Sequence, residues 1–135
     1  MSTYVADASA LLRYLDREPG FDRVAQLLKE AARGKIELLV SAVNWGEIIS
    51  VVYKAHGLSA ARNTSAKMQA LPLAIISVDI DQAETAGTLK HDFKLPYADA
   101  FAAALALARG ATLITGDFDF KPAAQTLPIE FLPTK

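Results

Sequence analysis

Apolar and polar residues follow two alternating patterns along this chain, short apolar runs and longer stretches with apolar residues three or four positions apart. The short runs predict strands at residues 3–6, 36–40, 73–78 and 111–115, with an edge strand at 129–132. The longer stretches predict helices at residues 8–16, 21–33, 41–55, 57–70, 79–92 and 97–108. Because strands alternate with helices, the pattern predicts an α/β fold whose parallel sheet is covered by helices on both faces.

Residues 95–119 set two acidic side chains at the ends of two otherwise apolar elements. Within the predicted helix 97–108 the one charged residue is Asp99, which predicts a buried helix with a carboxylate in its first turn. The predicted strand 111–115 leads to Asp117, with Asp119 just beyond. Open α/β sheets place their ligand crevice at the carboxyl ends of strands. We therefore expect the carboxylates of Asp99 and Asp117 to meet there.

Two further acids are expected at the same edge of the sheet. Asp7 directly follows the first strand, and Glu47 lies on the helix after the second strand, in a row with the apolar Val43 and Val51. Carboxylates that lie close together do not all remain ionised unless a cation lies between them. With Asp and Glu as the strong ligands and no nearby His or Cys, the expected cofactor is Mg²⁺, with Mn²⁺ as a second possibility.

Composition narrows the class of protein. A length of 135 residues with 52% hydrophobic residues predicts a single domain over residues 1–135. The absence of cysteine excludes disulfides and thiolate chemistry, and a net charge of −1 gives no broad basic surface of the kind that sequence-specific DNA binders carry. No secretory signal and no apolar stretch of membrane-spanning length is visible, so we expect a cytoplasmic protein without membrane contact.

Four segments in order resemble the motifs of PIN-domain ribonucleases, and more narrowly those of the VapC-type toxins of bacterial toxin–antitoxin systems. They are VADAS around Asp7, NWGE ending in Glu47, YADAFAAALA around Asp99 and LITGDFDF around Asp117. The resemblance implies a three-layer α/β/α fold with a central, mostly parallel sheet of four to five strands. It also implies Mg²⁺-dependent cleavage of RNA, with these four acids as catalytic and metal-binding residues. By the same comparison Ser9, Thr115 and Asp119 are supporting residues.

The resemblance further implies partners. These are an RNA substrate, a cognate VapB-type antitoxin and a second copy of the chain in a homodimer. The apolar face with Trp45 and Tyr53 is the expected surface for both proteins, and an antitoxin arginine is expected among the four carboxylates. The candidate contacts to the RNA backbone are Arg13, Arg17, Lys54, Arg62, Lys94 and Lys121.

Simpler interpretations stay open at this point. Asp7 and Asp99 are also ordinary acids for helix N-termini, Asp117 and Asp119 suit a turn, and Glu47 has Lys54 or Arg13 as surface partners. The alternative functions are a non-catalytic α/β interaction module with a degenerate acidic pocket, and a PIN nuclease in RNA processing that has no antitoxin. The spacing disfavours a receiver-type phosphoacceptor and a haloacid-dehalogenase-like phosphatase, which place second acids differently around the first one.

Overall fold

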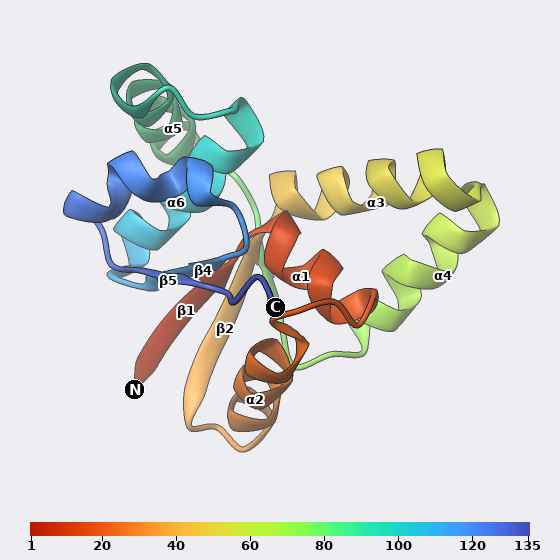
Figure 1. Cartoon of the computed structure of the whole chain (residues 1–135). Coiled ribbons are helices and arrows are strands. Elements are labelled where there is room, and N and C mark those ends of the chain that lie inside the picture. The colour runs from red at the N-terminus through yellow and green to blue at the C-terminus, as the bar shows by residue number, and fades with distance from the viewer.

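A computed structural model describes all 135 residues (Figure 1). Its strands are β1 Ser2–Ala6, β2 Ile36–Ser41, β3 Ala74–Ile76, β4 Thr112–Thr115 and β5 Ile129–Phe131. Its helices are α1 Ala8–Leu15, α2 Phe21–Ala32, α3 Ala42–His56, α4 Leu58–Gln69, α5 Ile80–Phe93 and α6 Tyr97–Arg109, and a 3-10 helix, η1, covers Phe118–Gln125. None of these helices has the length and apolar character needed to cross a membrane.

The five strands form one parallel sheet in the order β3-β2-β1-β4-β5. The chain moves outward from β1 through β2 to β3 on one side, and places β4 and β5 on the other side. The strand order therefore reverses between β1 and β4, where a crevice opens at the carboxyl ends of strands in folds of this kind. Ala6 pairs with Ile114, so Asp7 and the end of β4 lie at this position.

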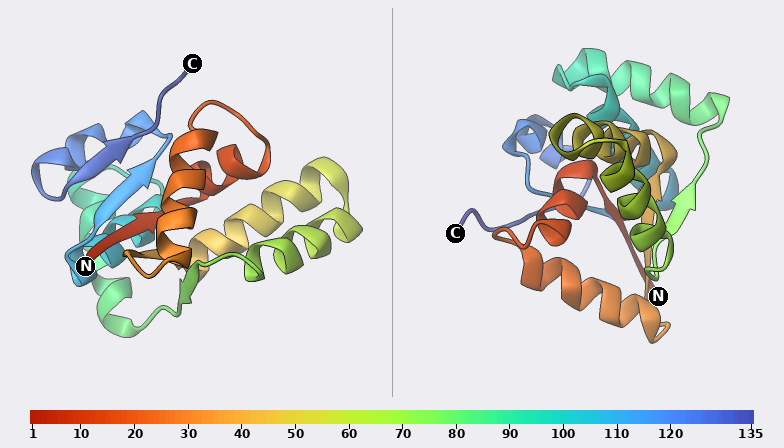
Figure 2. Two further views of the ribbon diagram at one scale, coloured as in Figure 1. Left: turned by 90° about the horizontal axis from the view of Figure 1, so that it is seen from below. Right: turned by 90° about the vertical axis from the view of Figure 1, so that its right-hand side faces the viewer.

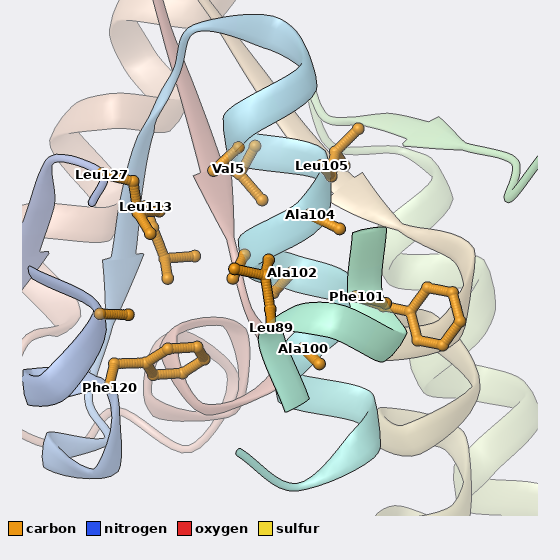
Figure 3. Packing of buried hydrophobic residues seen from close by; sticks show 14 of the residues in the cluster. Val5, Leu89, Ala100, Phe101, Ala102, Ala104, Leu105, Leu113, Phe120 and Leu127 are labelled. Atoms are coloured by element: carbon orange, nitrogen blue, oxygen red, sulfur yellow. The ribbon is translucent and has the colours of Figure 1, made fainter. Parts of the chain in front are cut away.

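The sheet separates two hydrophobic clusters and makes the fold a three-layer α/β/α structure, as predicted. On one face Val5 and Leu113 pack with α5, α6 and η1 (Figure 3). On the other face Ala6 and Ile114 pack with α1, α2 and α3 (Figure 1). Neighbouring strand residues thus point to opposite faces, and both faces are covered.

Helix α6 lies against the sheet along a run of small side chains. Every residue from Ala100 to Ala106 is buried, whereas Tyr97 and Leu107, at the two ends of the helix, are partly exposed. Alanine side chains allow the helix axis to approach the sheet closely. This close packing fixes the first turn of α6, which carries Asp99, beside the ends of β1 and β4.

Two elements differ from the sequence predictions. Strand β3 is shorter than the predicted 73–78, because it lies at the edge of the sheet and pairs only with β2. The segment between the predicted strands 111–115 and 129–132, to which the sequence pattern assigned no helix, forms η1, whose Phe120 and Ala123 are buried against the core. The burial of these two side chains holds the segment in a helical turn despite Pro122 within it.

Helices α3 and α4 form a hairpin that projects from the body of the protein (Figure 2). The base of α3 packs against the core, with Trp45 partly buried there. Further along the hairpin Val51, Tyr53 and Leu58 are exposed by 44%, 53% and 44%. The apolar surface therefore lies toward the tip, and Trp45 belongs largely to the core of the chain itself.

Candidate active site

Asp7 lies at the junction of β1 and α1 and is almost completely buried. Its Oδ1 accepts hydrogen bonds from the Ala10 amide at 2.9 Å and from the Ser9 hydroxyl at 2.8 Å, and its Oδ2 accepts one from the Thr115 hydroxyl at 2.5 Å. Burial raises the pKa of Asp7 to about 6, although the bonds from Thr115, Ala10 and Ser9 lower it in part. Asp7 therefore caps the N-terminus of α1, the ordinary role of an acid at this position, and it also contacts Thr115 at the end of β4.

Ser9 and Thr115 connect Asp7 to the segment that carries Asp117. The two hydroxyl oxygens are 3.2 Å apart. The Gly116 amide donates to Ser9 Oγ at 2.9 Å, and the Asp117 amide donates to Thr115 Oγ1 at 3.0 Å. One network of hydrogen bonds thus fixes the Asp7 carboxyl group and the backbone before Asp117.

Asp99 lies half-buried in the first turn of α6. Pro96 precedes this helix without a side-chain cap, so backbone N–H groups at its start favour a nearby carboxylate. Burial, followed by the negative charges of Asp7, Asp117 and Glu47, raises the pKa of Asp99 to about 7. The charges of three acids from three other elements therefore act on Asp99, at the edge of the sheet where the sequence predicted them.

Asp117 and Asp119 differ in their surroundings. Asp117 is partly buried at the start of η1, and its Oδ1 accepts a hydrogen bond from the Asp119 amide at 2.9 Å. Asp119 is exposed and is not among the charges that act on Asp99. The side chain of Asp119 therefore lies outside the group formed by the other acids.

Glu47 forms no ion pair. The single salt bridge of the molecule joins Arg23 to Glu130, so the surface pairing of Glu47 with Lys54 or Arg13 is wrong. Glu47 is partly buried, and its Oε1 is enclosed without a hydrogen-bond partner. An enclosed carboxylate oxygen without a donor is costly, and a cation is one partner that satisfies it.

The donor chemistry of these acids fits a hard divalent cation. All the donors are carboxylate oxygens, and one of them is unpartnered. Burial is the main cause of the raised pKa of Asp99, and the like charges that add to it are ones that a cation would offset. No three of the His, Asp or Glu side chains are arranged as a ready-made ligand set in the structure. Asp7, Glu47, Asp99 and Asp117 are the residues whose carboxylate oxygens would be available to such a cation.

The sequence analysis missed Asn44, which connects two of the elements that carry acids. This residue is fully buried on α3, and its Nδ2 donates to the Ala98 carbonyl, next to Asp99, at 3.0 Å. A lone amide between the apolar Val43 and Trp45, three residues before Glu47, was the available signal. Asn44 thereby fixes the start of α6 relative to α3.

The family model of the PIN domain matches residues 4–125, which is most of the chain. The chain belongs to the PIN-domain family. No curated protein matches the sequence of this PIN domain.

Several solved structures share the fold of this PIN domain. DNA-bound VapBC from Salmonella typhimurium aligns with a TM-score of 0.77 at 15% identity, covering 97% of this chain and 98% of that one. VapBC2 from Rickettsia felis, bound to a promoter fragment, gives 0.76 at 18% identity, covering 97% and 99%. VapC20 from Mycobacterium tuberculosis, a sarcin-ricin loop cleaving toxin, gives 0.68 at 20% identity, covering 89% and 94%. At these identities the likeness establishes a common fold, which confirms the predicted architecture.

Proposed function

We propose that this PIN domain is a Mg²⁺-dependent endoribonuclease, the toxin of a type II toxin–antitoxin system of the VapC kind. The observation that carries the proposal is a group of four carboxylates with no cationic side chain paired to any of them. Burial and the charges of Asp7, Asp117 and Glu47 raise the pKa of Asp99, which indicates that the group is not fully ionised without a cation. Asp7 and the end of β4, which leads to Asp117, lie where the strand order reverses, and this supports the proposal further.

In this proposal Asp7, Glu47, Asp99 and Asp117 hold Mg²⁺ or Mn²⁺. The bound cation supplies Lewis acidity toward a phosphodiester oxygen and lowers the pKa of water. Ser9 and Thr115 orient the Asp7 carboxylate through the hydrogen bonds that they donate. These supporting groups lie on regular elements, which suits a site that has to hold its geometry.

RNA is the proposed substrate. VapC20, which shares the fold, is described as cleaving the sarcin-ricin loop. Beside the segment that leads into α6, Gly87 leaves a shallow hollow of about 500 Å³ that Lys90, His91 and Lys94 surround. No acid lines this hollow, so it suits a phosphate of the RNA backbone.

A cleavage assay tests the proposed activity. The purified protein is incubated with a structured RNA in Mg²⁺ and, in parallel, with excess chelator. We expect cleavage at few sites in Mg²⁺ and none with chelator, because the acids do not act on the phosphodiester without a cation. Equal absence of cleavage in Mg²⁺, Mn²⁺ and chelator would favour the non-catalytic interaction module instead.

The proposed protein partner is a VapB-type antitoxin. The structures from Salmonella typhimurium and Rickettsia felis are VapBC proteins bound to DNA. Four carboxylates attract a guanidinium group, which cannot lose its charge and bridges two carboxylates through its planar set of donors. An antitoxin arginine among these acids would compete with the cation for the same oxygens.

Competition between Mg²⁺ and the antitoxin tests this partner. The probe is the product of the reading frame that adjoins the gene. Its affinity is expected to fall about tenfold as Mg²⁺ is raised to saturation, and this dependence is expected to disappear when the antitoxin arginine is changed to Ala. An affinity that is indifferent to both changes indicates inhibition by another route. If no adjoining frame encodes a binder, the alternative of a PIN nuclease in RNA processing is favoured.

The homodimer is part of the same proposal. Exposed apolar side chains toward the tip of the α3–α4 hairpin, Val51, Tyr53 and Leu58, support an intermolecular contact there. A two-fold arrangement would place two sites in one particle.

A further inference from the structure

Arg13, in the last turn of α1, uses its charged group to hold three separate backbone segments. Its Nη1 donates to the Pro133 carbonyl at 2.8 Å and to the Pro19 carbonyl at 3.2 Å, and its Nη2 donates to the Gly116 carbonyl at 3.0 Å. No carboxylate pairs with Arg13. The guanidinium group therefore joins the loop after α1, the turn after β4 and the segment after β5, which runs past α1 in Figure 1.

Two residues of α1 bind the Gly116 backbone, one through its amide and one through its carbonyl. Its amide donates to Ser9 Oγ at 2.9 Å, and its carbonyl accepts from Arg13 Nη2 at 3.0 Å. Ser9 and Arg13 are four residues apart, so they lie on the same face of the helix. Because both polar groups of Gly116 are fixed, the peptide plane that leads into Asp117 is fixed as well.

The approach of Arg13 to the backbone requires glycine at position 116. A Cβ atom there would lie 2.5 Å from Arg13 Nε and 2.6 Å from Arg13 Cζ, well inside van der Waals contact. Any side chain at this position would displace the guanidinium group. The glycine in the LITGDFDF segment is thus required by the position of Arg13, which lies 103 residues away along the chain.

We propose that Arg13 is a positioning residue that holds Asp117 toward the other acids through the Gly116 carbonyl. The inference rests on the proposed function for its catalytic consequence, whereas the positioning itself is independent of activity. Arginine suits this task because its planar group donates in several fixed directions and stays charged at every relevant pH. The hydrogen bonds to three carbonyls use both terminal nitrogens of Arg13, so we do not assign it the RNA-backbone contact expected from the sequence.

The variant Arg13→Met tests the proposal by removing the donors while keeping much of the apolar stem. The turnover number for RNA is expected to fall about 30-fold while KM changes less than about twofold, because the acids lose their alignment but the RNA surface does not change. The Asp117 amide is expected to exchange its hydrogen at least about tenfold faster than in the wild type, since the turn is no longer fixed. Arg13→Lys should restore part of both values.

Arg23→Met is the matched control, because it removes the single ion pair of the molecule, to Glu130 on β5, and leaves the acids untouched. If Arg13→Met behaves like this control in turnover and in Asp117 exchange, the proposal is wrong. A rise in KM at unchanged turnover would make Arg13 an RNA contact and would also overturn it.

Two further measurements test the role of Arg13 if the first variant does not fold or if the wild type is inactive. If Arg13→Met does not fold, Gly116→Ala displaces the same guanidinium group and is expected to give the same loss of turnover and the same faster exchange. If the wild type cleaves no RNA, the proposed function fails, but exchange at Asp117 still decides whether Arg13 fixes the turn.

Discussion

Replacing Asp99 with Asn is expected to lower the rate of RNA cleavage at least about 100-fold while the protein stays folded. The amide has the shape of the carboxyl group but cannot offer a charged oxygen to a cation. Asp99 is the acid on which the charges of Asp7, Asp117 and Glu47 all act, so its loss removes the centre of the group. The measurement is the single-turnover cleavage rate at saturating Mg²⁺, with circular dichroism as the check on folding.

Asp79→Asn is the matched control for this substitution. Asp79 also lies at the start of a helix, where its Oδ1 accepts from the Gln82 amide at 2.8 Å, but it is exposed and lies beside the last turn of α6, whereas Asp99 lies in the first turn. Asn caps helices as well as Asp does, so the control should keep both stability and cleavage. Cleavage by Asp99→Asn at the rate of Asp79→Asn would contradict the proposed role of Asp99.

Raising the pH from about 5 to about 8 is expected to lower the free energy of unfolding of the metal-free protein relative to that of Asp99→Asn. The folded-state pKa values of Asp7 and Asp99, about 6 and about 7, exceed the ordinary value of 3.8. Between the ordinary value and the folded-state values, the folded protein binds more protons than the unfolded chain. The free energy of unfolding is therefore higher at low pH, and it falls as the pH rises through the folded-state pKa values.

The expected size of this effect is about 1–2 kcal/mol for Asp99, which is less than its full shift implies because the side chain is half exposed and solvent screens its charge. Urea unfolding at several pH values, in chelator, measures it for the wild type and for Asp99→Asn. The two stability curves should separate progressively between about pH 4 and about pH 7, with the variant becoming the more stable protein, and should keep a constant difference at higher pH. A constant difference between the two curves from about pH 4 to about pH 7 would show that neither burial nor the charges of the other acids raise the pKa of Asp99.

The order of elements was readable from the sequence because each element carries its own periodic signal. The buried helix with Asp99 and the strand before Asp117 both follow from runs of apolar residues, and the parallel sheet follows from the alternation. That Asp7 and Asp117 lie close together depends in addition on the pairing of β4 with β1. This pairing is determined by long-range packing and not by the local sequence pattern.

Other features of the site could not be read from local patterns. Segment η1 is helical because Phe120 and Ala123 pack against the core, and the sequence pattern assigned no helix to the residues around Pro122. Arg13 resembles any surface cation in sequence, and its partners are 6, 103 and 120 residues away. Asn44 gave a weak signal as a polar residue in an apolar row, but its bond to the Ala98 carbonyl depends on the packing of α3 against α6.

Direct measurement of Mn²⁺ binding to the metal-free protein tests most directly whether Asp7, Glu47, Asp99 and Asp117 form one cation site. Electron paramagnetic resonance of free Mn²⁺ gives the dissociation constant for the wild type, for Asn or Gln variants of these acids, and for Asp79→Asn. We expect the wild type and Asp79→Asn to bind equally, and each of the four variants to bind at least about tenfold more weakly, since each acid contributes a charged oxygen. Binding by all four variants with the wild-type dissociation constant would contradict the account.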